Sequence, residues 1–314
     1  MLKDQPRTTM KIDLITKISM SNTGIRMALW MGEKLPAGIV YRIASLLASA
    51  AATRRNSKLM RAIRHNQSVI LNQAENSKAV ALQAKRIVKN QSRYLSDFYH
   101  LLNQPSKVVE KMHFSPRLTE VLANARSSQR GLLLLTTHTS AFDLAGLSFA
   151  YHGLQPLVLG VPNPPKSYLW QNRLRNERGL LTLPMSISAL GQARERLQTG
   201  GLVVTGLDRP LPDAKHHPRF FDRPSDLPVA YVRLALRADA RVHVVGCRDM
   251  PDGSYQIECS EEVVFEAKPQ SDIELIENAE AALRQAQSII QHDPTLWMMF
   301  FPVWSSHPTL IDKG

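Results

Sequence analysis

A histidine and an aspartate stand five residues apart where an apolar run gives way to a helical stretch. The run, Leu132–Thr137, is typical of a strand buried on both faces, and His138 follows it directly. Ligands of open α/β sheets bind at the carboxyl ends of the strands, so we expect the site in this turn. Asp143 is positioned to fold back onto the imidazole, fix its tautomer and stabilise the imidazolium. A histidine held in this way can take a proton from an alcohol near neutral pH.

The spacing of this H-x4-D pair is not specific by itself. The chain contains two further matches, His217 with Asp222 and His307 with Asp312, and neither follows an apolar strand. The surrounding sequence therefore has to show which of the three matches is functional. The alternative for His138 is an ordinary core or loop histidine, and for Asp143 a carboxylate that stabilises a helix start.

Several motifs of other enzyme classes are incomplete or absent in this sequence, which argues against those classes. His216-His217 invites comparison with an HHxxxDG acyltransferase motif, but Asp222 lies one residue too far and Arg223 stands where glycine belongs. No phosphate-binding loop, dinucleotide-binding G-x-G-x-x-G or hydrolase G-x-S-x-G is present. No metal-ligand spacing surrounds Cys247 or Cys259, so we expect neither a metal nor a cofactor.

Strand-like and helical stretches alternate after Gly131, which predicts an α/β fold with a mostly parallel central sheet covered by helices. A further strand after the Asp252-Gly253 turn should run antiparallel to its predecessor. The predicted strands are 132–137, 157–161, 180–183, 202–207, 242–247 and 255–260. The predicted helices are 141–152, 167–178, 188–198, 227–237 and 272–291.

Residues 1–128 are predicted to form a helical N-terminal region, and residues 129–314 the α/β domain. Within the first region, Ile25–Thr53 has apolar residues at helical spacing among arginines and lysines, with Trp30 and Tyr41. This pattern suits docking on an anionic membrane surface, and it equally suits a packed helix with solvated arginines. The stretch Leu35–Ala52 is interrupted by proline and arginine, and no apolar stretch reaches the roughly 20 residues of a spanning helix.

The bulk composition favours a polyanionic partner. The 314 residues carry a formal net charge of +12, which suits nucleic acid, anionic lipid headgroups or an acidic carrier protein without choosing among them. The sequence shows no cleavable signal peptide, and two cysteines with no partner pattern favour reduced thiols. Both observations point to the cytoplasm.

Five blocks follow one another in a fixed order from Gly131 to Tyr255. Together they resemble the bacterial lipid A biosynthesis acyltransferases, the lauroyl and myristoyl transferases of the lysophospholipid acyltransferase superfamily. Phosphatidylinositol-mannoside acyltransferases are close relatives of that family. The blocks are Gly131–His138 with Asp143–Gly146, Asn172–Asn176, Leu197–Asp208, Phe220–Ala240 and Val242–Tyr255.

The resemblance implies acyl transfer from an acyl-carrier protein or acyl-CoA to a hydroxyl of a membrane glycolipid or phospholipid. His138 and Asp143 match the catalytic pair, Arg173 matches an arginine that the family needs, and Asp208 matches the acid of the third block. We expect Arg173 and Asp208 at the cleft that holds His138, where Asp208 would position Arg173 or a substrate hydroxyl. Substrate binding is assigned to Thr139, Ser140, Arg175, Arg178 and Arg209.

The resemblance also implies a peripheral or monotopic enzyme on the cytoplasmic face of the inner membrane. The family usually has Gly-Asn-Trp before the acid where this chain has Ser140–Phe142, and Pro-Asp-Gln where it has Leu207–Arg209. These departures concern the acceptor more than the reaction. Two other functions are open: a non-catalytic lipid-binding protein of the same fold, and a basic nucleic-acid-binding protein. No zinc-finger spacing or aromatic-rich RNA-binding motif supports the second, so no nucleic acid is expected.

Overall fold

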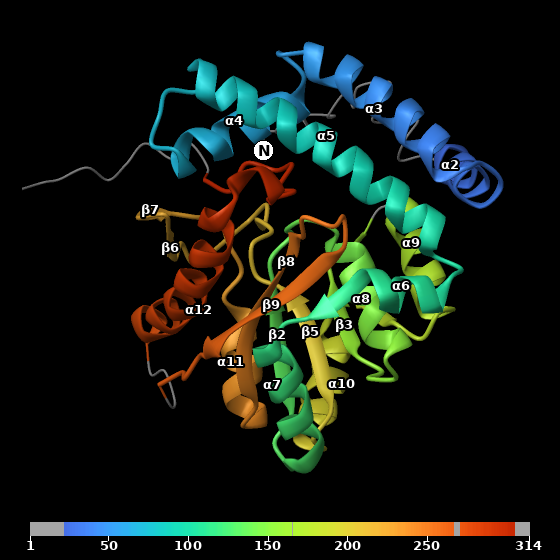
Figure 1. Ribbon diagram of the computed structural model, residues 1–314. Helices are drawn as coiled ribbons and strands as arrows, with labels where there is room; N and C mark the ends of the chain where they lie inside the picture. Colours follow the sequence, from blue (N-terminus) through green and yellow to red (C-terminus); the bar gives the residue numbers. More distant parts are fainter. Residues whose placement is uncertain (1–21, 165, 267–270, 305–314) are drawn as a thin grey trace, which may run out of the picture.

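The computed structural model describes residues 22–164, 166–266 and 271–304, and its centre is a seven-stranded sheet in the order β1-β9-β8-β2-β5-β3-β4 (Figure 1). All neighbours in this sheet are parallel except β8 and β9. The predicted α/β class with a mostly parallel sheet is confirmed. The strands are β1 (Met112–Phe114), β2 (Leu132–Thr136), β3 (Leu157–Gly160), β4 (Leu181–Pro184), β5 (Leu202–Gly206), β8 (Arg241–Asp249) and β9 (Tyr255–Glu262).

Helices cover both faces of the sheet because its central strands are apolar on both faces. Leu133 and Leu135 of β2 pack into one buried cluster with residues of the helices on the first face, while Leu132 and Leu134 pack into a second cluster with residues of the helices on the opposite face. The first face carries α10 (Ile187–Gln198), α11 (Ala230–Ala238) and α12 (Asp272–His292). The second carries α7 (Pro116–Ser127) and α8 (Phe142–Tyr151), and α9 (Lys166–Asn176) packs beside β4.

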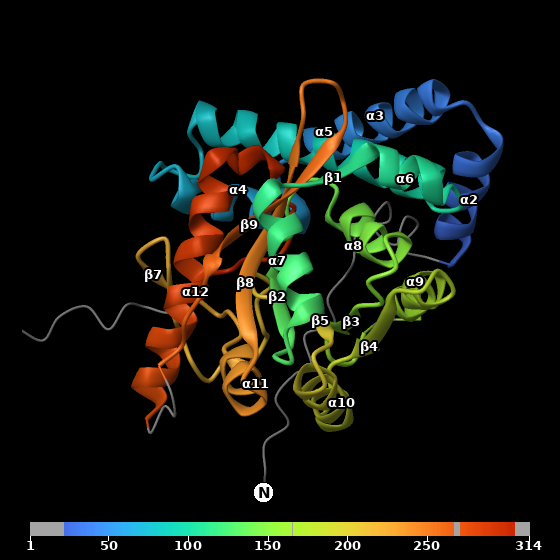
Figure 2. The same ribbon diagram turned by 60° about the horizontal axis from the view of Figure 1, so that its bottom comes forward.

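The N-terminal helices form an outer layer above this α/β body (Figure 2). Helix α5 crosses the carboxyl edge of the sheet and contacts both α8 and η1 (Pro294–Leu296), so it lies over the turn that follows β2 (Figure 1). Helices α2 and α3 pack on its outer side. The bounds are α2 (Asn22–Lys34), α3 (Ala37–Thr53), α4 (Lys58–Ile70), α5 (Lys78–Leu101) and α6 (Pro105–Lys111).

Several details differ from the sequence prediction. The stretch Ile25–Thr53 is two helices, because Pro36 precedes α3 and its ring opposes a continuous helix. Strand β1 lies inside the predicted helical region, and at three residues it is too short to show a period. A two-stranded ribbon of β6 (Arg219–Phe220) and β7 (Arg223–Pro224) was also not predicted. Among the helices that the structure describes, none has the length and apolar character needed to cross a membrane.

Candidate active site

The register of β2 and β5 brings His138 and Asp208 together. Thr136 is paired with Gly206 at the end of the two parallel strands, so the residues two positions further along, His138 and Asp208, also face each other. His138 Nδ1 lies 2.5 Å from Asp208 Oδ1, and the backbone N–H of His138 donates to Oδ2 at 2.8 Å. A carboxylate only accepts hydrogen bonds, so Nδ1 carries the proton and Nε2 is the basic nitrogen of the neutral ring.

Asp208 is fully buried and stays ionised because its partners outweigh the cost of burial. Burial disfavours the charged form, but the charge of His138 and hydrogen bonds from His138 and Trp297 hold the pKa of Asp208 below its ordinary value. The indole Nε1–H of Trp297 donates to Oδ2 at 2.8 Å. The carboxylate is therefore fixed from two sides before any substrate is present.

The imidazole of His138 is held in place by its neighbours and remains partly open. About 20% of its side chain is exposed, the ring of Phe142 lies against it at 4.8 Å between centroids, and no hydrogen-bond partner of Nε2 occurs in the part of the chain that the structure describes. Gly206 leaves room for the ring, since a Cβ at this glycine would lie 3.0 Å from the His138 Cε1 atom. Nε2 is thus free to receive a proton from a substrate.

The backbone of this loop is pinned by a segment far along the chain. Met298 N–H donates to the carbonyl of His138 at 2.7 Å, and Ser140 N–H donates to the carbonyl of Leu296 at 2.7 Å. Between these contacts, Thr139 forms an antiparallel bridge with Trp297. The segment that supplies the indole to Asp208 therefore also positions the loop that carries His138.

Asp143 occupies a different place from the one expected. Its carboxylate is ion-paired with Arg175 of α9 and makes no hydrogen bond to His138 in the described structure. The reason lies in the backbone, since Ser140 has a φ of 49° and turns the chain into α8, whose first turn carries Asp143 toward α9. Arg175 is further fixed by the side-chain oxygen of Asn172 at 2.9 Å. The structure thus gives the orienting position beside His138 to Asp208.

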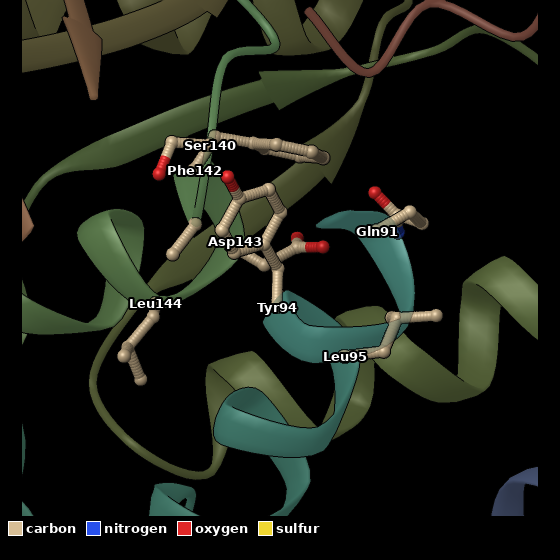
Figure 3. Close-up of a pocket in the computed structure, with 8 residues that line it drawn as sticks. Gln91, Tyr94, Leu95, Ser140, Phe142, Asp143 and Leu144 are labelled. Carbon is tan, nitrogen blue, oxygen red and sulfur yellow. The ribbon is translucent and has the colours of Figure 1, made fainter. Parts of the chain in front are cut away.

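A small hollow lies between α5 and the start of α8 (Figure 3). Gln91, Tyr94 and Leu95 line it from α5, and residues 140–144 line it from the other side. Asp143 therefore stands at the boundary between this hollow and Arg175.

The other arginines expected at the site are spread over two regions. Arg173 has 77% of its side chain exposed and lies 3.7 Å from Glu177, one turn further along α9. Arg178 binds Asn103 and the carbonyls of Leu102 and Leu174, away from His138. No hydrogen bond or ion pair in the described structure joins either arginine to His138 or Asp208.

Arg209 follows Asp208 and is held between two aromatic rings. Its guanidinium lies 5.2 Å from the centre of the Tyr168 ring and 4.6 Å from that of Phe301. Thr139 and Ser140 are buried, and their hydroxyl groups bind protein atoms: Thr139 accepts from the Cys247 N–H, and Ser140 donates to Asp249. Of the arginines assigned to substrate binding, Arg209 directly follows Asp208, and Arg175 is connected to the His138 loop through Asp143.

Sequence reasoning missed three residues that shape this site: Trp297, Gly206 and Asp249. Trp297 falls in a stretch with no helical or strand period, so no pattern marks it. Gly206 was visible only as a residue near the end of the apolar run 202–207. The signal for the His138–Asp208 pair itself was present, because both residues follow apolar strands by the same distance.

The arrangement supports general-base chemistry on an alcohol, with an oriented histidine, a buried carboxylate and cations nearby. Comparison with known proteins identifies the family. No curated protein matches the sequence. A family model described as bacterial lipid A biosynthesis acyltransferase matches residues 15–306, which is nearly the whole chain. The protein therefore belongs to the bacterial lipid A biosynthesis acyltransferase family.

Proposed function

We propose that this protein transfers a fatty acyl chain from an acyl-carrier protein or acyl-CoA to a hydroxyl group of a membrane glycolipid or phospholipid. The observation that carries the proposal is the His138–Asp208 pair, with Nδ1 bound to a buried carboxylate and Nε2 without a partner in the described structure. His138 acts as the general base, and Asp208 orients it. A lipid A-like acceptor is the first candidate, since the family acts in lipid A synthesis.

The reaction needs no acyl-enzyme intermediate. His138 Nε2 takes the proton of the acceptor hydroxyl, whose oxygen attacks the thioester carbonyl carbon and forms the ester bond. The carbon–sulfur bond then breaks, and the proton passes from Nε2 to the leaving thiolate. Burial raises the pKa of both Cys247 and Cys259 to about 12, so neither thiol competes as a nucleophile near neutral pH.

The first turn of α8 is suited to the oxyanion of the tetrahedral intermediate. The first N–H groups of a helix have no acceptor within the helix, and the macrodipole favours negative charge there. Helix α8 begins with no side-chain cap, directly after the loop that carries His138. Backbone donors preorganised in this way are typically worth 100- to 1,000-fold in rate, roughly.

Arg175 and Arg209 are the proposed contacts for phosphate groups of the donor or the acceptor. Arg209 is preorganised by its two aromatic neighbours, and Arg175 by Asp143 and Asn172. Guanidinium groups bind phosphate oxygens in pairs, and a guanidinium held in one orientation loses less entropy on binding. Because Arg173 is largely exposed, Arg175 replaces it in this proposal as the arginine of its sequence block.

Helices α2 and α3 are the proposed contact with the anionic membrane that contains the acceptor. The opposite face of α3 is buried through Val40, Ala48 and Ala52, so its exposed apolar residues are not explained by packing inside the protein. The exposed apolar side chains are Met27, Trp30, Ile39, Leu46 and Leu47, and the exposed basic ones include Arg26, Lys34 and Arg42. Apolar side chains ringed by cations suit an anionic lipid surface, here the cytoplasmic face of the inner membrane.

The decisive experiment is an acyl-transfer assay with matched histidine variants. Purified protein is incubated with lauroyl and myristoyl thioesters of acyl-carrier protein or CoA and with a lipid A-type acceptor in mixed micelles, and the product is identified by mass spectrometry. His138→Ala should lower kcat by roughly 100- to 10,000-fold. His217→Ala, whose H-x4-D match lies outside the sheet edge, should remain close to the parent rate.

The two alternative functions give different results in the same assay. A lipid-binding protein without catalysis would bind the mixed micelles and form no acylated product with either donor. A nucleic-acid-binding protein would do neither. Equal rates for the parent and for folded His138→Ala would remove His138 from the mechanism.

A further inference from the structure

The turn that carries His138 is anchored on a side opposite to Asp208, by a carboxylate at the end of β8. Ser140 Oγ donates to Asp249 Oδ1 at 2.6 Å. The same carboxylate accepts from the hydroxyl of Tyr94, 3.0 Å from both oxygens, and is ion-paired with Arg93. Tyr94 and Arg93 belong to α5, so Asp249 joins three separate elements at one point: β8, α5 and the catalytic loop.

Ser140 needs such an anchor because of its backbone. Its φ of 49° lies in the left-handed region, which residues other than glycine, asparagine and aspartate rarely adopt. The residue is completely buried, and its N–H is held by the carbonyl of Leu296. A strained conformation persists only where surrounding contacts fix it, and here these contacts include the backbone bond to Leu296 and the side-chain bond to Asp249.

We infer that Asp249 is a positioning residue for acyl transfer, acting through Ser140 on the two groups that the reaction uses. Ser140 stands two residues after His138 and immediately before Ala141, where α8 begins. Its conformation therefore sets both where the imidazole lies and where the first N–H groups of α8 point. The inference rests on the proposed function, because it names a role in that same reaction.

The contacts of Asp249 also make α5 part of the active site. Tyr94 faces Ser140–Asp143 across the small hollow of Figure 3. One turn further along α5, Asp97 accepts from the hydroxyl groups of Tyr41 in α3 and Tyr255 in β9. Asp97 binds the same helix to the same hairpin but does not contact Ser140 in the described structure, so it provides a matched control.

The experiment compares four variants of the full chain in the acyl-transfer assay: Asp249→Ala, Asp249→Asn, Ser140→Ala and Asp97→Asn. Asp249→Ala and Ser140→Ala should each lower kcat by roughly 10- to 100-fold and leave KM for both substrates within about twofold, because neither residue touches a substrate. Asp249→Asn keeps an oxygen that accepts from Ser140 and should recover most of the rate. The double variant Asp249→Ala/Ser140→Ala should be no slower than the slower single variant, because both substitutions remove the same hydrogen bond between Ser140 and Asp249.

The pH profile separates this role from that of the catalytic pair. The dependence of kcat on pH should keep the shape seen in the parent in Asp249→Ala, since the contact between His138 and Asp208 is untouched. Parent kcat in folded Ser140→Ala would overturn the inference, as would an equal loss in Asp97→Asn, which would mean that any weakening of the α5 contact is sufficient. Ser140→Ala removes a single hydroxyl and keeps the test valid should Asp249→Ala fail to fold. Failure of the parent protein to transfer acyl groups would instead refute the proposed function.

Discussion

His138 and Asp208 stand at equivalent positions of two adjacent parallel strands, each two residues beyond the last pair of β2 and β5. Their contact is therefore produced by the sheet itself and does not depend on a flexible loop. A shift of the register by one residue would separate the imidazole from the carboxylate. The register of the two strands therefore sets the geometry of the proposed base.

Replacing Asp208 with asparagine should lower kcat by roughly 1,000-fold or more. The amide nitrogen can donate to Nδ1, which favours the tautomer with its proton on Nε2, and that nitrogen can then no longer accept a proton from the substrate. Steady-state kinetics with both donors measure the loss. A variant that keeps more than a tenth of the rate would show that another group orients the imidazole.

The same substitution should change how stability depends on pH. The pKa of Asp208 is lowered in the folded protein, so its contribution to stability is present above the ordinary carboxyl pKa of 3.8 and is lost as pH falls through the lower folded value. Asp208→Asn lacks this titration. Urea unfolding between pH 7 and about pH 3 should therefore show a smaller loss of stability in the variant than in the parent.

Arg175→Ala and Arg173→Ala form a matched pair two residues apart on α9. Arg175→Ala leaves the mostly buried Asp143 carboxylate without its ion pair and removes a proposed phosphate contact, so kcat/KM should fall by roughly 10- to 100-fold. Arg173→Ala removes an exposed side chain whose pair with Glu177 is worth little, and it should stay within about twofold of the parent. The reverse order of effects would return the catalytic role to Arg173.

Gly206→Ala should impair catalysis with little effect on folding. The added methyl group would lie 3.0 Å from the His138 Cε1 atom, so the ring has to move and its hydrogen bond to Asp208 is distorted. We expect kcat to fall by about tenfold, because small displacements of a reacting group are costly. Gly191→Ala in α10 is the control, since its Cβ meets no atom within 4 Å and the helix favours alanine.

A single acidic side chain on α3 should weaken membrane binding. Leu46→Glu places a charge at an apolar position that is 71% exposed, so the folded protein is little affected while contact with an anionic bilayer becomes unfavourable. Cosedimentation with vesicles of phosphatidylglycerol and phosphatidylethanolamine measures binding. Ile187→Glu, at a site 92% exposed on α10, should bind as the parent does. Equal binding by both variants would place the docking surface elsewhere.

The apolar runs made the sheet predictable, and with it the position of His138. Runs such as Leu132–Leu135 are typical of a strand that is buried on both faces, and most of the predicted fold rested on them. The order of strands in the sheet is not encoded in such runs. Asp208 was expected at the cleft that holds His138, but the placement of β5 directly beside β2, which gives the two residues their contact, is seen only in the structure.

Local spacing was less informative about the partners of each side chain. Asp143 stands close to His138 in sequence, but the left-handed conformation of Ser140 directs it to Arg175. That conformation has no signature in the sequence, since serine rarely adopts it. The role of Trp297 could not be predicted either, because it lies in an irregular segment where the sequence has no helical or strand periodicity.

The segment from Leu296 to Met298 is synthesised long after His138 and Asp208, so it determines when the site is completed. A nascent chain that has emerged as far as Asp208, two residues beyond β5, contains both members of the pair, but it lacks the indole that holds the carboxylate and the backbone that pins the catalytic loop. It also lacks β8, and with it Asp249. The base is therefore assembled only after some 160 further residues, counted from His138 to Met298, have left the ribosome. Until then, the emerging chain holds only part of the proposed site.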